Sequence, residues 1–285
     1  MAHRHVRVSA RPRLAACVLI LVLAVTGCGA AETGAAAAPS GSAAGRSAAV
    51  DSPVAVGRIP VVCSAWVDAD AAGASVLLNA DLGSGTPEQL QAIVKEFWAA
   101  QEPILASMEP APEPIRAEVG TLLAVAREGA STGDAATFSS PELVAAGRSI
   151  DEYMLRECGY DQVQVTTTDH AYQGLPSTVR SGAVGITVDN QGQDVHQVMI
   201  IRANDGVTQP FSVMLELAPE QRAQLATPLG SVEVEPGETS TVFFRLIPGR
   251  YGAVDLLAQG TTSFAAPGDG PPHFSLGMQS EFTAT

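Results

Sequence analysis

The segment Pro272-His273-Phe274-Ser275-Leu276-Gly277-Met278, close to the end of the chain, decides the fold class that the sequence favours. It places an imidazole and a thioether at either side of a short loop that contains a glycine. Two such side chains can bind one metal ion. A short strand around Phe282 follows, and no cysteine occurs after Cys158. The segment therefore predicts a ligand loop that has no thiolate.

Upstream of this loop the residue pattern predicts β-structure. From Gly159 onward apolar and polar residues alternate with a period of two, which is typical of half-buried strands. Turn-forming pairs such as Pro236-Gly237 and Pro248-Gly249 separate the runs. About seven short strands of this kind predict an antiparallel β-sandwich over 160–285, with a short inserted helix at 218–226. The alternation is carried by Val163, Val165, Val184, Ile186, Val188, Val232, Val234, Val242, Phe244, Leu246 and Phe282.

Between the two central cysteines the period is helical. Thr86, Pro87 and Gln89 form an N-cap, a first-turn proline and a capping box, which predict a helix start. A second apolar stripe runs from Ile115 to Ala126, and Ser140-Pro141-Glu142 opens a third helix that closes at Cys158-Gly159. A shorter helix is expected at 66–80. The expected order is α+β, with a helical domain at 59–159 before the sandwich.

Four places in 160–285 resemble the cupredoxins, the small blue-copper β-sandwiches. They are Asp169-His170-Ala171-Tyr172, Val188-Asp189-Asn190-Gln191-Gly192 with His196 after it, Pro248-Gly249-Arg250-Tyr251, and the loop Pro272–Met278. By position, the resemblance implies copper as the metal and His196, His273 and Met278 as ligands. The family's cysteine falls near Asp255, with Val254 and Leu256 as alternatives.

The chain departs from the family pattern at this site. The missing thiolate removes the strong copper–sulfur bond, and about a dozen residues are inserted before Pro272, where the family often has two. Two imidazoles, a thioether and a carboxylate predict a non-blue site suited to storage or delivery of copper. In the alternative interpretation the scaffold has lost its metal. His196 then caps a strand, His273 bonds a loop carbonyl and Met278 packs in the core.

The N-terminus reads as a targeting segment. Four arginines precede a short apolar run from Leu14 to Val25, too short to cross a membrane. Val25-Thr26-Gly27-Cys28 resembles a bacterial lipobox, so 1–27 is expected to be a signal peptide and Cys28 the lipidated N-terminus. Residues 28–58 are then an Ala/Gly/Ser tether. The whole chain resembles an actinobacterial-type lipoprotein, anchored to the outer face of the cell membrane.

The cysteines and the net charge limit which folds and which partners are possible. Cys63 and Cys158 are the two cysteines left in the folded part, and in an exported protein they are expected to form a disulfide. Closing a loop of about 100 residues stabilises by about 4–5 kcal/mol in the chain-entropy model. The chain carries a net charge of −14, which becomes −18 when the four signal arginines leave. This charge argues against nucleic acid and anionic lipid as partners, because both need a basic patch.

No motif in the sequence names an enzyme. There is no G-x-S-x-G, H-E-x-x-H, P-loop or C-x-x-C pattern. The acidic pairs Asp68/Asp70 and Asp151/Glu152 are expected on solvated faces, and Trp66 and Trp98 in a helical core.

Three hypotheses follow from the sequence. The first is a non-enzymatic binding or interaction module of the cell envelope, with a protein partner of unknown identity and no resident cofactor. The second is a copper-handling protein that uses His196, His273 and Met278. The third is an active site in the cleft between the two domains, where pockets often form.

Overall fold

The computed structural model describes residues 60–79, 86–263 and 266–285. The predicted signal peptide, Cys28 and the tether lie outside these residues. Four α-helices come first, and we call residues 60–159 the helical region: α1 Val61–Asn79, α2 Pro87–Ala106, α3 Arg116–Thr132 and α4 Pro141–Glu157, with 3-10 turns η1 Glu113–Ile115 and η2 Ala135–Ser139.

The rest of the chain is the β region, residues 160–285. Its strands are β1 Asp161–Thr168, β2 Ala171–Gln173, β3 Thr178–Val179, β4 Gly182–Asn190, β5 His196–Ala203, β6 Ala226–Val234, β7 Thr239–Leu246, β8 Gly249–Val254 and β9 Gln279–Ala284. Two short helices, α5 Phe211–Leu215 and α6 Pro219–Leu225, lie between β5 and β6, and the turn η3 spans His273–Leu276. Helix α6 confirms the helix predicted around 218–226.

The helix starts and ends follow local sequence signals. At α2 the Thr86 hydroxyl accepts a hydrogen bond from the Gln89 amide, and the Gln89 side chain accepts one from the Thr86 amide, which confirms the capping box. Helix α4 ends at Glu157 with Cys158 as its C-cap, and Gly159 takes the left-handed φ of 63° that the C′ position needs. Helix α1 begins at Val61, before the predicted start at 66, because its weak periodicity gave no clear boundary.

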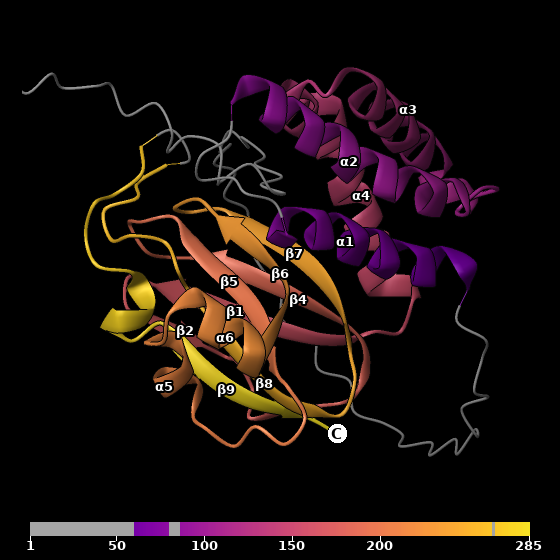
Figure 1. The fold of residues 1–285 in the computed structure, drawn as a ribbon. Helices are drawn as coiled ribbons and strands as arrows, with labels where there is room; N and C mark the ends of the chain where they lie inside the picture. The colour runs from indigo at the N-terminus through magenta and orange to yellow at the C-terminus, as the bar shows by residue number, and fades with distance from the viewer. Residues whose placement is uncertain (1–59, 80–85, 264–265) are drawn as a thin grey trace, which may run out of the picture.

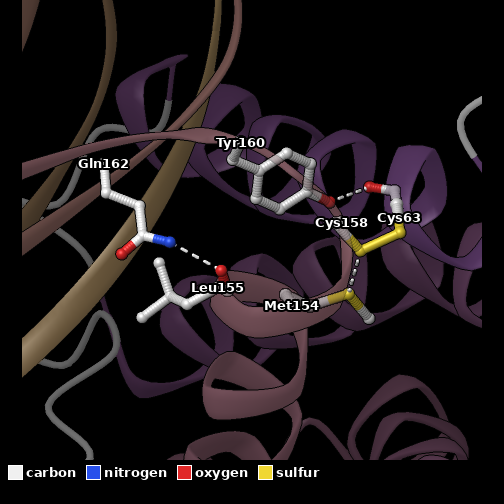
Figure 2. The surroundings of a disulfide bond; sticks show 6 residues. All are labelled: Cys63, Met154, Leu155, Cys158, Tyr160 and Gln162. Atoms are coloured by element: carbon white, nitrogen blue, oxygen red, sulfur yellow. Dashed lines mark hydrogen bonds between the residues drawn. A yellow bond between two sulfur atoms is a disulfide. The ribbon is translucent and has the colours of Figure 1, made fainter. Parts of the chain in front are cut away.

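The predicted disulfide is present and closes the helical region. Cys63 on α1 is bonded to Cys158, 95 residues further along the chain. Figure 2 shows the bond beside the Tyr160 hydroxyl, which donates a hydrogen bond to the Cys63 carbonyl. The Gln162 side chain donates to the Leu155 carbonyl across the same junction. The disulfide and the Tyr160 hydrogen bond therefore join the end of the helical region to α1, and the Gln162 hydrogen bond joins β1 to α4.

The β region consists of two sheets around one core. One has the order β2-β1-β4-β7, the other β3-β9-β8-β5-β6. The prediction of an antiparallel sandwich is wrong in one respect, because the sheets are mixed: β1 pairs parallel with β4, and β3 with β9. Alternation identifies the buried face of a strand but not its direction. The connection between β1 and β4 is long enough to return the chain for parallel pairing.

The helical region packs against the outer face of the four-stranded sheet. Figure 1 shows α1 lying along β6 and β7 beneath the other helices. Phe243 of β7 belongs to the helical core, where its ring lies 5.4 Å from that of Tyr160. Asp68 of α1 forms an ion pair with Arg245 at 2.8 Å. In the described part of the chain no helix is long and apolar enough to span a membrane.

Two glycines of α3 allow a matched test of this packing. A Cβ on Gly129 would lie 2.0 Å from Cδ1 of Trp98, which is fully buried, whereas a Cβ on Gly120 meets nothing within 4 Å. We expect Gly129→Ala to lower the free energy of unfolding by about 1–3 kcal/mol through overpacking. Gly120→Ala should raise it by about 1 kcal/mol, the helix-propensity gain. Urea unfolding of both variants checks this, and equal effects would contradict the helix packing described here.

Candidate metal centre

Three adjacent strands of the five-stranded sheet end or begin at the same place. His196 is the first residue of β5, Asp255 follows the end of β8, and Met278 precedes β9. Because β5 and β9 both run antiparallel to β8, their first residues meet the end of β8 at one edge of the sheet. The fold thus brings together side chains that are far apart in sequence.

The carboxylate of Asp255 lies at the centre of this cluster and has no exposed surface. Its Oδ2 atom is 3.0 Å from Nδ1 of His196 and 3.1 Å from Nδ1 of His273. The amide of Leu257 donates to the other oxygen at 2.9 Å. One carboxylate oxygen therefore faces both imidazoles through the same ring nitrogen.

The turn before β5 determines where His196 lies. Asn190 is buried, and its side chain donates to the carbonyls of Asp194 and Val234 while accepting from the Gly192 amide. A Cβ at Gly192 would lie 2.7 Å from Nε2 of His196, so a larger residue there would displace the imidazole.

The long loop before His273 leaves this histidine in contact with Asp255. A bridge between Ala258 and Pro272 closes the base of the inserted loop, and the His273 amide donates to the Leu257 carbonyl at 2.9 Å. The loop before His273 therefore has a closed base, and His273 contacts Asp255 although the two residues lie 18 positions apart in the chain.

Met278 is fully buried, and its backbone is hydrogen-bonded to both His273 and Asp255. Its amide donates to the His273 carbonyl at 3.1 Å, and its carbonyl accepts from the Asp255 amide, also at 3.1 Å. The backbone of Met278 thus fixes the distance between His273 and Asp255.

Two further carboxylates face the outer nitrogens of the imidazoles. Oδ2 of Asp194 is 3.1 Å from Nε2 of His273, and Oδ1 of Asp169 is 3.7 Å from Nε2 of His196. A metal-binding histidine commonly has such a carboxylate on its other nitrogen, which orients the ring and raises its basicity. Nothing in the spacing of the sequence pointed to Asp194 or Asp169. Their only signal was their closeness to His196 and His170 in the chain.

The charges in this cluster support one another. Burial by itself lowers the pKa of His273, but the hydrogen bonds and charges of Asp255 and Asp194 outweigh it and raise that pKa above the usual 6.5. Burial by itself raises the pKa of Asp255. The hydrogen bonds from both histidines and the charge of His273 outweigh it, and the pKa falls below 3.8. Without a metal, a proton on each Nδ1 can therefore satisfy the carboxylate.

A second polar layer, which the sequence analysis missed, supports Asp255 from the strand side. The Gln197 amide donates to its Oδ2 at 3.2 Å, and the Gln197 side chain donates to Glu233 at 2.6 Å. Burial raises the pKa of Glu233 above 4.5. The acceptor oxygen of Asp255 is held from several directions.

The residue types of this cluster are ones that metal ions use as ligands. The ligand atoms of His196, Asp255 and His273 lie within 4.8 Å of one another. Ligands about 2.0–2.2 Å from a metal, at angles of about 90–110°, lie about 2.8–3.6 Å apart, which includes both nitrogen–oxygen distances seen here. Cys63 and Cys158 are bonded to each other, so within the described residues no thiolate accompanies this set.

The structure brings most of the predicted site residues together. His196, His273 and Asp255 converge, and Met278 is buried with its backbone hydrogen-bonded to His273 and Asp255. Of the alternatives for the cysteine position, Val254 packs in an apolar cluster and Leu256 lies against it. His170 is exposed, as expected for a residue outside the site.

Comparisons with known proteins show likenesses of low identity. No protein-family model matches the chain, and no curated protein does. Reduced auracyanin from the photosynthetic bacterium Roseiflexus castenholzii is 20% identical over 45% of this chain and 99% of its own, with a TM-score of 0.29. Auracyanin A, a "blue" copper protein from Chloroflexus aurantiacus, is 18% identical over 45% of this chain and 100% of its own, with a TM-score of 0.27. At such scores nothing below rests on these likenesses.

The buried ion pair predicts a pH-dependent stability. With a chelator present, Asp255→Asn should lower the free energy of unfolding by about 3–5 kcal/mol near pH 6, because it removes the buried carboxylate that faces Nδ1 of both His196 and His273. The raised pKa of His273 means that its contribution is complete below 6.5 and is lost as pH rises through the folded value. The lowered pKa of Asp255 means that its contribution is present above 3.8 and is lost in acid. Urea unfolding from pH 3 to 9 measures both limits.

The surface variant Asp205→Asn serves as the control. Asp205 pairs with Arg202, but its side chain is 91% exposed, so the loss should stay within about 1 kcal/mol and change little between pH 5 and 9. If Asp255→Asn were no more destabilising than this control, the buried network would not have the described role.

Proposed function

We propose that this protein is an extracytoplasmic, lipid-anchored binding protein of the cell envelope whose β region holds one copper ion in a non-blue site. His196, His273 and Asp255 are the ligands, with Met278 as a fourth. The role is non-enzymatic handling of copper, by storage or delivery. The cupredoxin-like character of the β region belongs to the same proposal.

The observation that supports it most is the shared oxygen of Asp255. Two fully buried imidazoles direct the same ring nitrogen toward one fully buried carboxylate oxygen, at 3.0 and 3.1 Å. A purely structural histidine needs only one partner for each ring nitrogen. Convergence of two imidazoles on one point is the arrangement that a shared metal ion requires.

The donor atoms favour copper over other divalent metals. For sites of nitrogen and oxygen ligands, affinity rises along the first-row series to a maximum at Cu(II). The thioether of Met278 adds a soft ligand that suits Cu(I) as well. A carboxylate in place of a thiolate removes the tuned couple of blue-copper electron carriers, so fast electron transfer is not the proposed role.

The location is proposed from residues outside the described part of the chain. The arginines before Leu14, the short apolar run and Val25-Thr26-Gly27-Cys28 support export and lipidation. Attached acyl chains would hold the folded part at the membrane surface through the Ala/Gly/Ser tether, whose reach is on the order of 30 Å.

Copper titration of the purified ectodomain tests the site. We expect one Cu(II) per molecule by calorimetry, with an electron paramagnetic resonance signal and no intense blue thiolate band. His273→Ala and His196→Ala should each weaken the affinity by at least about 100-fold, because each removes a ligand nitrogen.

His170→Ala is the matched control, since it removes an exposed imidazole close to the site in sequence. It should bind copper like the wild type. Absence of binding in the wild type, or equal weakening by His170→Ala, would reject the copper site. The β region would then be a scaffold that serves a protein partner at the envelope.

Replacement of the lipidated residue tests the anchor. We expect Cys28→Ser to move the protein expressed in a bacterial host from the detergent phase to the aqueous phase of a Triton X-114 partition, because no acyl chain can be attached. Cys17→Ser is the control, since Cys17 lies in the predicted signal peptide, and it should leave the protein in the detergent phase. Wild-type protein found in the aqueous phase would contradict the anchor.

A further inference from the structure

The helical region encloses a second polar site that shares no residue with the metal centre. A cavity of about 50 Å³ lies among α1, α2, α4 and the face of β7. Its size leaves room for about three to five water-sized groups. The polar side chains that line it include Asp70, Gln101 and Asp151, and its aromatic side chains include Trp66, Trp98 and Phe138.

Two carboxylates face this cavity without a cation. Asp70 accepts from the Phe243 amide at 3.3 Å, and Asp151 accepts from Nε1 of Trp66 at 3.0 Å. Each carboxylate thus uses one oxygen in a hydrogen bond. No Lys, Arg or His is among the described residues that line the cavity. The expectation that these two acids lie on solvated faces is wrong, since both are partly buried.

Their surroundings penalise the negative charge that they carry. Burial raises the pKa of Asp70 to about 7. Burial and the nearby charge of Asp70 raise the pKa of Asp151 well above 3.8. A cation placed between them would relieve both effects.

A buried amide faces the same space. Gln101 is only 7% exposed and lines the cavity, yet the structure gives its side chain no hydrogen-bond partner among the described residues. A buried amide without a partner is costly in a folded protein. The side-chain amide of Gln101 is therefore available to a ligand that enters the cavity.

The remaining wall is aromatic and suits an organic cation. The rings of Trp98 and Phe138 stack at 5.3 Å, and Phe97 meets both of them edge to face. Ring faces attract an ammonium group, and tryptophan does so most strongly. A hard ion such as Ca²⁺ needs six to eight oxygen ligands, which this wall does not provide.

A wider groove continues from the cavity to the surface. It has a volume of about 470 Å³, lies between α4 and the four-stranded sheet, and shares Asp151 and Thr241 with the cavity. Hydroxyl and amide groups line it, together with Glu152 and Glu238, and Arg148 is the only basic residue among its described lining. A ligand whose charged end entered the cavity could extend along this acidic, polar groove.

We propose that this cavity binds the primary ammonium group of a small aliphatic amine, whose remainder lies in the groove. The three N–H donors of the ammonium match the three acceptors Asp70, Asp151 and Gln101. A second ammonium, as in a diamine, meets Glu152 and Glu238 in the groove.

Putrescine is the probe, and 1,4-butanediol is its neutral counterpart of the same length. We expect calorimetry to show saturable 1:1 binding of putrescine to the ectodomain and none of butanediol. The chain has two tryptophans, Trp66 and Trp98, and both line the cavity, so binding should also change the intrinsic fluorescence. Absence of putrescine binding, or equal binding of both compounds, would overturn the proposal.

Variants separate this site from general attraction to an acidic surface. Asp151→Asn and Gln101→Leu should each weaken putrescine binding at least about tenfold, while Glu128→Gln, an exposed residue of α3, should leave it unchanged. Equal weakening by all three would mean surface attraction only and would reject the site. Circular dichroism checks folding, and if Asp151→Asn does not fold, the uncharged exchange Gln101→Leu decides. His273→Ala should bind putrescine normally, which keeps this test independent of the copper site.

Discussion

A single carboxylate oxygen organises the β region. Oδ2 of Asp255 receives Nδ1 of His196, Nδ1 of His273 and the amide of Gln197, all in a place closed to solvent. A charge buried in this way is costly unless it is paired and hydrogen-bonded. The strand ends, the closing bridge of the long loop and Asp194 all contribute to that pairing. In the proposed site, a metal ion would replace the protons that the two imidazoles share with this carboxylate.

The two regions of the chain provide two chemically different environments. The edge of the five-stranded sheet offers nitrogen and oxygen ligands in a fully buried cluster. The outer face of the four-stranded sheet, covered by the disulfide-closed helices, offers carboxylates, an unpaired amide and aromatic rings around a small cavity. The helical region therefore has a proposed role of its own. The disulfide at Cys63 and Cys158 joins both ends of that region, which helps to keep α1 and α4 together around the cavity.

Sequence could predict the features that depend on neighbouring residues. The capping box at Thr86, the strand faces and the disulfide follow from local pattern or from export chemistry. Strand β5 was not evident as an alternating run, because both of its faces are buried and its central residues, 198–201, are all apolar. The parallel pairing of β1 with β4 was missed for a different reason, since direction depends on the path of the connection.

Only those residues of the candidate site that lie in the segments resembling cupredoxins could be predicted from the sequence. It supplied His196, His273, Met278 and the position of Asp255, whereas Asp194 faces its histidine through a contact between residues 79 positions apart. The cavity in the helical region was missed altogether. Its carboxylates come from different helices, and each alone reads as an ordinary surface acid. Such clusters form when helices pack together, so no pattern of neighbouring residues in the sequence predicts them.

Anomalous diffraction at the copper edge from Cu(II)-soaked crystals of the ectodomain would test the central claim most directly. The account predicts one strong peak about 2.0–2.2 Å from Nδ1 of His196, Nδ1 of His273 and a carboxylate oxygen of Asp255. It would be contradicted by a map with no peak at this position, in which both imidazoles remain hydrogen-bonded to Asp255 and copper is seen only on exposed carboxylates.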